Sequence, residues 1–169
     1  MKRYVIVGAS GRAFSMFAKP ITEQFSDVAE LVGIYDPNET RAKYFRDNSA
    51  PKAQIFDDFD KMISTARPDA VIVTTIDKFH HEYIIRALES GCDAISEKPL
   101  TIDEDKCNAI LEAQKRTGKK VLVTFNCRFI PFVKRIKELI NEGLLGEILN
   151  VDFEYLLDTS HGADYFRRW

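Results

Sequence analysis

The chain has 169 residues, of which 45% are hydrophobic and 30% are charged, so it is long enough to bury a substantial core and has the composition of a globular protein. Its 24 basic and 26 acidic residues give a formal net charge of −2, which provides no large positive field for nucleic acid or an anionic membrane. No segment of the sequence approaches the roughly 20 apolar residues needed to span a bilayer.

The first predicted element is a strand over residues 3–8, which runs into the turn "GASGRA". A dinucleotide-binding fingerprint has glycine at three positions, and here Gly8 fills the first while Ser10 and Ala13 occupy the other two. Ser10 and Ala13 are small enough to approximate those roles, and Gly11 adds freedom. The Ser10 hydroxyl and a following helix start could bind a phosphate. A turn without a ligand is the alternative.

Short apolar runs then alternate with segments of helical periodicity, which predicts βαβ units and a parallel sheet. The predicted strands cover residues 3–8, 29–36, 53–58, 68–75, 92–99 and 119–126. The predicted helices cover residues 12–25, 38–48, 79–91 and 101–118. We therefore expect an α/β fold, a Rossmann-type doubly wound parallel sheet, over residues 1–125.

Individual residues predict where these helices begin, end and face the core. Pro20 should kink the first helix or mark its start. Asn38 is the expected N-cap of the second helix, and Thr101 or Asp103 that of the fourth. The expected C-caps of the third and fourth helices are Gly91 and Gly118. The residues of the fourth helix expected to face the core are Cys107, Ile110, Leu111 and Gln114.

The pattern changes near residue 127. A helix is predicted over residues 128–147, and the residues expected on one of its faces are Val133, Ile136, Ile140 and Leu144. Residues 148–158 then alternate like a strand of a half-exposed antiparallel sheet. We expect residues 126–169 to be a connecting helix and the first strand of a truncated α+β second domain, because a lone strand cannot form a sheet.

Asp36 ends the second apolar run, where an acidic side chain can hydrogen-bond both ribose hydroxyls of an adenosine. A carboxylate there repels a 2′-phosphate, so the sequence favours NAD over NADP, although Arg41 nearby keeps NADP open. The sequence Asp-Pro-Asn is also a good turn and helix N-cap region, which is the alternative.

Polar residues follow the fourth predicted strand. Thr74, Thr75 and Asp77 lie at its carboxyl end, where open α/β sheets bind ligands, and could line the nicotinamide side. His80 and His81 follow at a helix start, but adjacent helical histidines point about 100° apart, so no metal site is expected. For His80 the alternative is a satisfied, partly buried histidine.

Charged residues follow the fifth and sixth predicted strands. Glu97 and Lys98 come directly after the fifth strand, and Pro99 keeps Lys98 extended. A lysine held there could bind a substrate hydroxyl and pass its proton. Asn126 and Arg128 end the sixth strand and could face the same crevice. A solvated surface lysine and a helix-entry turn with an ion-paired arginine are the alternatives.

In order and spacing, these segments resemble the Gfo/Idh/MocA family, the oxidoreductases related to glucose-fructose oxidoreductase and inositol dehydrogenase. The match rests on "VIVGASGRA", "YDPN", "TTIDKFHHEYIIRALESG", "EKPLT" and "FNCRF", and it covers the chain as the family's N-terminal, NAD(P)-binding half. Departures are Ser10, Ala13 and, where the family usually has proline, Ile76.

The resemblance implies a role for each matching residue. Lys98 is the implied catalytic residue. The implied cofactor-binding residues are Gly8, Ser10, Gly11 and Arg12 at the pyrophosphate, Asp36 at the adenosine ribose, Glu97 near the nicotinamide ribose, and Thr74, Thr75, His80, Lys98, Asn126 and Arg128 along the crevice. The implied cofactor is NAD, with NADP less favoured.

The family's second domain supplies most substrate contacts and often the oligomer interface. The resemblance therefore implies a homo-oligomer for the full-length protein, and a fragment that binds cofactor but is itself inactive. Four polar residues in the last segment of this sequence could reach toward the substrate in a complete protein, and they are His161, Asp164, Arg167 and Arg168.

The expected function is transfer of hydride between a nicotinamide cofactor and a hydroxyl carbon of a sugar, cyclitol or related polyol. The alternative is a non-catalytic dinucleotide-binding or redox-sensing module. A short-chain dehydrogenase is disfavoured because Phe14 stands where its third glycine belongs and no Tyr-x-x-x-Lys pair is present. The spacing of Cys92, Cys107 and Cys127 fits neither a disulfide framework nor a zinc site, so we expect the protein to lie in a reducing cytoplasm. From the charge balance and the lack of a long apolar segment, we expect no nucleic-acid or membrane partner.

Overall fold

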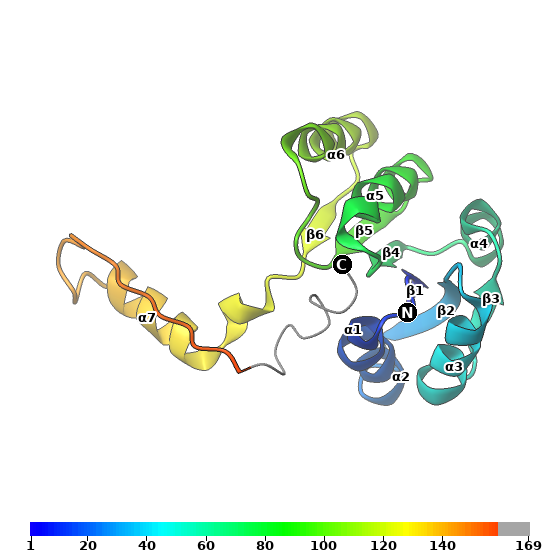
Figure 1. Cartoon of the computed structure of the whole chain (residues 1–169), viewed down its shortest axis with the longest axis horizontal. Coiled ribbons are helices and arrows are strands. Elements are labelled where there is room, and N and C mark those ends of the chain that lie inside the picture. The colour runs from blue at the N-terminus through cyan, green and yellow to red at the C-terminus, as the bar shows by residue number, and fades with distance from the viewer. Residues whose placement is uncertain (159–169) are drawn as a thin grey trace. The chain divides into compact units, whose positions relative to one another are not determined.

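A computed structural model describes residues 1–158, and the chain divides into two compact units, Met1–Phe125 and Asn126–Trp169 (Figure 1). The first unit is built on six strands, β1 (Lys2–Val7), β2 (Ala29–Tyr35), β3 (Gln54–Phe56), β4 (Ala70–Val73), β5 (Asp93–Ser96) and β6 (Val121–Val123). Its helices are α1 (Gly11–Ala13), a π-helical segment (Phe14–Ala18), α2 (Lys19–Glu23), α3 (Glu39–Ser49), α4 (Phe59–Ala66), a 3₁₀ turn (Asp77–Phe79), α5 (His80–Glu89) and α6 (Glu104–Thr117).

The six strands form one sheet in the order β3-β2-β1-β4-β5-β6, and every neighbouring pair is parallel. The predicted doubly wound Rossmann-type fold is thus confirmed. In this order the chain starts in the centre, winds outward to β3, and returns beside β1 as β4. After β1 and after β4 the chain therefore continues toward opposite sides of the sheet, and the switch point between these two strands is where such sheets bind ligands.

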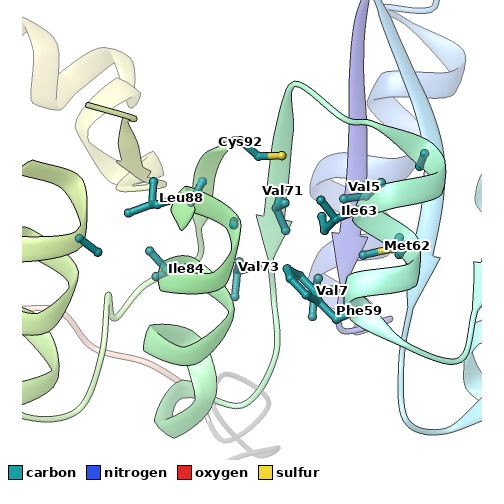
Figure 2. Packing of buried hydrophobic residues seen from close by; sticks show 14 of the residues in the cluster. Val5, Val7, Phe59, Met62, Ile63, Val71, Val73, Ile84, Leu88 and Cys92 are labelled. Atoms are coloured by element: carbon teal, nitrogen blue, oxygen red, sulfur yellow. The ribbon is translucent and has the colours of Figure 1, made fainter. Parts of the chain in front are cut away.

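Continuous apolar sequence in the central strands reflects burial on both faces of the sheet. Val5 and Val7 of β1 point to the face covered by α4, α5 and α6, while Ile6 points to the face covered by the first helices and α3. Figure 2 shows the first face, where Val71 and Val73 of β4 lie between residues of α4 and α5. This two-sided core fixes the strand ends that carry the polar residues.

The first helical segment changes character at its proline. After α1, the residues Phe14–Ala18 form π-helical turns, and α-helix resumes at Lys19 with Pro20 in its first turn. Proline has no N–H to donate to the preceding turn, so a helix tolerates it best at such a start. Pro20 was predicted to kink the first helix or to mark its start, and the structure places it in the first turn of α2, directly after the π-helical turns.

The predicted caps are present. The side chain of Asn38 accepts a hydrogen bond from the N–H of Arg41 at 3.0 Å, and that of Asp103 accepts one from Lys106 at 2.9 Å. Gly118 ends α6 in the left-handed conformation, with φ of 68°. Gly91 follows α5 with φ of 83°. Capping residues thus set the helix boundaries at the level of single residues.

Two features of the helices differ from the prediction. Helix α4 was not predicted, although Asp58 caps it and Phe59, Met62 and Ile63 bury one face. In α6 the buried residues are Ile110 and Ala113, and Leu111 is 45% exposed, so placing Leu111 in the inward stripe was wrong. Because α6 covers the edge of the sheet, its buried face is narrow.

The second unit is described up to residue 158. It contains a 3₁₀ turn (Asn126–Phe129) and helix α7 (Pro131–Asn141), on which Ile136 and Ile140 are exposed. Residues 148–158 are not in a strand, so this prediction was wrong for the chain as it stands. A strand needs a neighbour to accept and donate its backbone hydrogen bonds, and the described part of this unit has none.

Candidate functional site

The turn after β1 and the end of β4 are in close backbone contact. Gly8 has φ of 93°, and a Cβ atom added to it would lie 2.7 Å from the carbonyl oxygen of Thr74. The hydroxyl of Thr74 donates to the carbonyl of Gly8 at 2.7 Å, and the N–H of Gly8 donates to the carbonyl of Tyr35 at 2.9 Å. Gly8 is therefore required by the backbone itself, and it joins the carboxyl ends of three strands.

The remaining roles of the dinucleotide-binding fingerprint are shared among three other residues of the turn, Ser10, Gly11 and Ala13. The hydroxyl oxygen of Ser10 accepts the N–H of Ala13 at 3.0 Å, which makes Ser10 the N-cap of α1, and its own O–H remains a donor. Ala13 is fully buried, as close helix-to-sheet packing requires. A Cβ on Gly11 would meet nothing within 4 Å, so the space beside the helix start is open. This start is suited to a phosphate.

Asp36 lies at the carboxyl end of β2 with its carboxylate fully occupied. Its Oδ2 accepts the N–H of Ala9 at 2.7 Å and Nε of Arg41 at 2.9 Å. Its Oδ1 accepts the N–H of Asn38 at 2.8 Å and Nη2 of Arg41 at 2.7 Å. The hydrogen bonds to Asp36 raise the pKa of Arg41, so the guanidinium stays charged. From the sequence, Asp36 and Arg41 were both expected to affect the choice between NAD and NADP, but their bidentate ion pair was not predicted.

Glu97 lies at the carboxyl end of β5, and two other segments and the next residue in the chain reach its carboxylate. Its Oε1 accepts Nε of Arg12 at 3.0 Å and the hydroxyl of Thr124 at 2.9 Å. Its Oε2 accepts the N–H of Lys98 at 3.3 Å. Because Glu97 is only 6% exposed, these contacts compensate a buried charge. They also tie the turn after β1 to the ends of β5 and β6.

Lys98 projects from the same strand end, and its side chain is exposed. Within residues 1–158, no hydrogen bond or ion pair engages its ammonium group, whereas its backbone N–H is held by Glu97. The Lys98–Pro99 peptide bond is cis. The structure thus presents a free amine on a fixed backbone at the sheet edge, as a group that exchanges a proton with a ligand would need.

His80 is buried below the carboxyl ends of the strands and is not among the exposed residues there. The residue is 1% exposed, and its two ring nitrogens face the carbonyl oxygens of Pro99, at 2.8 Å, and Thr75, at 3.0 Å. This geometry does not support a direct cofactor contact for His80, and favours the alternative of a satisfied buried histidine. It joins the loop after β4 to the loop after Lys98. Thr74 is likewise 5% exposed and acts through its bond to Gly8.

The structure therefore brings most of the predicted site residues of the first unit to one edge of the sheet. Hydrogen bonds connect Asp36 to the Gly8 turn, Gly8 to Thr74, and Arg12 to Glu97. Thr124 was missed, and its only signal in the sequence was its place at the end of a predicted strand. Asp77, also predicted there, begins the 3₁₀ turn before α5.

Other predicted residues lie elsewhere. Asn126 and Arg128 belong to the 3₁₀ turn of the second unit, so their roles stay predictions. The four polar residues predicted to reach substrate lie outside the described residues, and they are His161, Asp164, Arg167 and Arg168.

Residues 1–158 contain no group of three or more histidine, cysteine, aspartate or glutamate side chains that could hold a metal ion. None of the helices in that range has the length and apolar character needed to cross a membrane. Cys92 is buried, which raises the pKa of its thiol, and Cys107 and Cys127 are also free.

Residues 2–125 match the Gfo/Idh/MocA family, described as an oxidoreductase family with an NAD-binding Rossmann fold. Over its whole length the chain is 40% identical to the oxidoreductase YteT of Bacillus subtilis (strain 168), covering 40% of that protein. It is 33% identical over 122 residues, 72% of the chain, to inositol 2-dehydrogenase of Corynebacterium glutamicum (strain R), covering 36% of it.

Among solved structures, scyllo-inositol dehydrogenase of Lactobacillus casei with bound NAD(H) and scyllo-inositol superposes with a TM-score of 0.78 at 25% identity. The superposition covers 88% of this chain and 43% of that structure. The chain thus spans about 40% of the length of the curated relatives it matches.

Proposed function

Because the chain belongs to the Gfo/Idh/MocA family of oxidoreductases, we propose that the protein transfers hydride between a nicotinamide cofactor and a hydroxyl-bearing carbon of a sugar, cyclitol or related polyol. The observation that carries the proposal is the position of Lys98. It is an exposed amine on a backbone held by Glu97, at the carboxyl edge of an NAD-binding Rossmann domain.

The residues of the first unit suit an extended dinucleotide. The helix start at Gly11 and Arg12, with the donor hydroxyl of Ser10, would hold the pyrophosphate. Asp36 would accept the adenosine ribose hydroxyls, which favours NAD over NADP. Glu97 and Thr75 would lie on the nicotinamide side. Asn126 and Arg128 are proposed to complete that side on the evidence of the family motif alone.

The bound cofactor supplies the hydride acceptor, and the protein supplies position and a proton exchanger. When the substrate is oxidised, its C–H bond gives a hydride to the nicotinamide and its hydroxyl loses a proton. The amine of Lys98 is placed to take that proton, and its ammonium would return it to the oxygen when a carbonyl is reduced. Glu97 and His80 act indirectly, because they hold the backbone on either side of Lys98.

Substitution of Lys98 tests the proposal in the natural protein that carries this chain. We expect Lys98→Ala to lower turnover of a sugar or cyclitol with NAD by about 10²- to 10⁴-fold, the usual contribution of a positioned acid or base. Binding of NADH should change by no more than about twofold, because the half-site for adenosine is untouched. Steady-state NADH formation and a calorimetric titration measure the two effects.

Lys120→Ala is the matched control. Lys120 is also an exposed lysine next to a strand, but it lies just before β6, at the amino ends of the strands, whereas Lys98 lies at the carboxyl ends. Unchanged turnover in Lys98→Ala would refute the catalytic role. NADH binding without oxidation of any polyol in the unsubstituted protein would instead favour the alternative of a redox-sensing module.

The proposal extends to the setting of the protein. Three free cysteines and a net charge of −2 fit a reducing cytoplasm, with a small-molecule substrate and no nucleic-acid or membrane partner. We expect the full-length protein to be a homo-oligomer and the 169-residue chain to bind cofactor without turnover. Size measurement of the natural protein, beside that of this chain, tests the expected assembly.

A further inference from the structure

A carboxylate lies directly before the exposed amine of Lys98, yet the two groups are not paired. Glu97 is the preceding residue, and its Oε2 already accepts the backbone N–H of Lys98 at 3.3 Å. Within residues 1–158, the ammonium group of Lys98 makes neither a hydrogen bond nor an ion pair. Because the four-carbon stem of a lysine is flexible enough to fold back onto such a carboxylate, a specific interaction must keep the two groups apart.

Arg12 supplies the positive charge that Glu97 would otherwise find in Lys98. Its Nε donates to Oε1 of Glu97 at 3.0 Å, although the two residues are 85 positions apart in the sequence. The side chain of Glu97 is 8% exposed, so its charge is largely shielded from water and requires a nearby cation. The turn after β1 therefore provides the counter-ion of a carboxylate at the end of β5.

The other side chains around this carboxylate cannot take the place of Arg12. Thr124 donates a hydroxyl to Oε1 of Glu97 at 2.9 Å but carries no charge. The two ring nitrogens of His80, from α5, face backbone carbonyl oxygens. Without Arg12, Lys98 is the cation whose backbone already touches Glu97. Because an unpaired buried charge is costly, the ammonium of Lys98 should then fold back onto this carboxylate.

We propose that Arg12 is a positioning residue, which keeps the amine of Lys98 available to a substrate by neutralising Glu97. This inference rests on the proposed function, because the substrate contact is the one assigned there to Lys98. It gives Arg12 a role beyond the pyrophosphate. Within residues 1–158 its Nε faces Glu97, while its two terminal nitrogens make no hydrogen bond and stay available to a phosphate oxygen.

Competitive labelling of the 169-residue chain measures the state of Lys98 without any turnover. A trace of acetic anhydride acylates lysines, and peptide mass spectrometry compares Lys98 with the exposed Lys120. Arg12→Met should slow acylation of Lys98 about three- to tenfold relative to Lys120, because a carboxylate beside an ammonium favours the charged, unreactive form. The double variant Arg12→Met/Glu97→Gln should return to within about twofold of the unsubstituted chain, since no charge is left to hold Lys98.

Turnover of the natural protein that carries this chain gives a second measurement. At saturating NAD and substrate, Arg12→Met should lower kcat about three- to tenfold, whereas Arg12→Lys, which keeps the charge, should lower it by less than about twofold. In a Glu97→Gln background, Arg12→Met should change kcat by less than about twofold. Loss of a pyrophosphate contact alone would instead raise KM for NAD equally in both backgrounds.

Arg86→Met is the matched control. The side chain of Arg86 is 39% exposed, against 37% for Arg12, and it forms an ion pair with Asp60 at 2.9 Å between α5 and α4. Its loss removes the same charge without touching Glu97, so acylation of Lys98 and kcat should both stay within about twofold. Circular dichroism melting confirms that each variant is folded before measurement.

The outcomes separate the inference from the proposed function. If Lys98 in Arg12→Met is acylated as fast as in the unsubstituted chain, or if Glu97→Gln does not restore the rate, the role of Arg12 is refuted and the proposed function stands. If acylation changes as expected but Lys98→Ala keeps full turnover, Arg12 does hold Glu97 away from Lys98, and the catalytic role of Lys98 alone fails.

Discussion

Two buried carboxylates mark the two ends of the candidate site, and they are held in different ways. Asp36, at the end of β2, accepts three of its four hydrogen bonds from Asn38 and Arg41, which follow it within five residues, and the fourth from Ala9 in the turn after β1. Glu97, at the end of β5, is bound by Arg12 from the turn after β1. Three of the four hydrogen bonds to Asp36 are therefore local in the sequence, whereas both short hydrogen bonds to Glu97 come from distant segments of the assembled sheet.

The hydrogen bonds of the two carboxylates also differ in symmetry. Each oxygen of Asp36 accepts one backbone N–H and one guanidinium N–H, at 2.7 to 2.9 Å. The two oxygens of Glu97 are bonded unequally, because Oε1 accepts two short hydrogen bonds whereas Oε2 accepts a single one, at 3.3 Å, from the N–H of Lys98. The same chemical change should therefore have different effects at the two ends.

The largest effect is expected at Gly8, which connects both ends. In Gly8→Ala the new Cβ would lie 2.7 Å from the carbonyl oxygen of Thr74, and the backbone has φ of 93°. Strain in this conformation and overlap with backbone should lower the free energy of unfolding by about 3 kcal/mol or more. Binding of NADH should be lost with the geometry of the turn. Urea denaturation and fluorescence titration measure the two losses.

Gly11→Ala is the control for that variant. A Cβ at Gly11 meets nothing within 4 Å, and alanine favours helix, so the free energy of unfolding should stay the same or rise by up to about 1 kcal/mol. Equal destabilisation by both substitutions would show that the turn is not limited by the contact between Gly8 and Thr74.

The next largest effect is expected for Asp36→Asn. Whichever oxygen is replaced, the new NH₂ group meets a backbone N–H that cannot move away. Such a buried donor-to-donor conflict should lower the free energy of unfolding by about 2 kcal/mol, and loss of the charged acceptor should weaken NADH binding by about tenfold or more. An unfolding midpoint equal to that of the unsubstituted chain would contradict the symmetry described for Asp36.

The smallest effect is expected for Glu97→Gln. The NH₂ group can take the place of Oε2, where it meets only the long contact from Lys98, while the amide oxygen keeps Arg12 and Thr124. The free energy of unfolding should fall by less than about 1 kcal/mol. If this variant unfolds more readily than Asp36→Asn in urea, the comparison between the two ends is wrong.

Much of the fold could be predicted from the sequence because local signals agreed with one another. Apolar runs marked each of the six strands, and Asn38, Asp103 and Gly118 marked helix ends by capping chemistry that acts within a few residues. Helix α4 was missed although its signal was present, since Asp58 precedes an apolar period of three and four residues. The strand over residues 148–158 was wrongly predicted because alternation records a suitable surface and not a partner strand.

The site was predictable to the level of which residues gather at the sheet edge, and less so for what each one does. Position at a strand end fixes where Asp36, Glu97 and Lys98 lie. It does not show that His80 and Thr74 spend their polar atoms on backbone carbonyls. Nor does it show that Arg41 folds back on Asp36, because side-chain pairing depends on the assembled loops.

We propose that the first unit is a nicotinamide dinucleotide site with Asp36 at the ribose. Calorimetric titration of the folded 169-residue chain with NADH and with NADPH tests it most directly. We expect saturable binding of one NADH per chain, with NADPH bound more weakly, since the Asp36 carboxylate opposes a 2′-phosphate. A folded chain that binds neither nucleotide would contradict it.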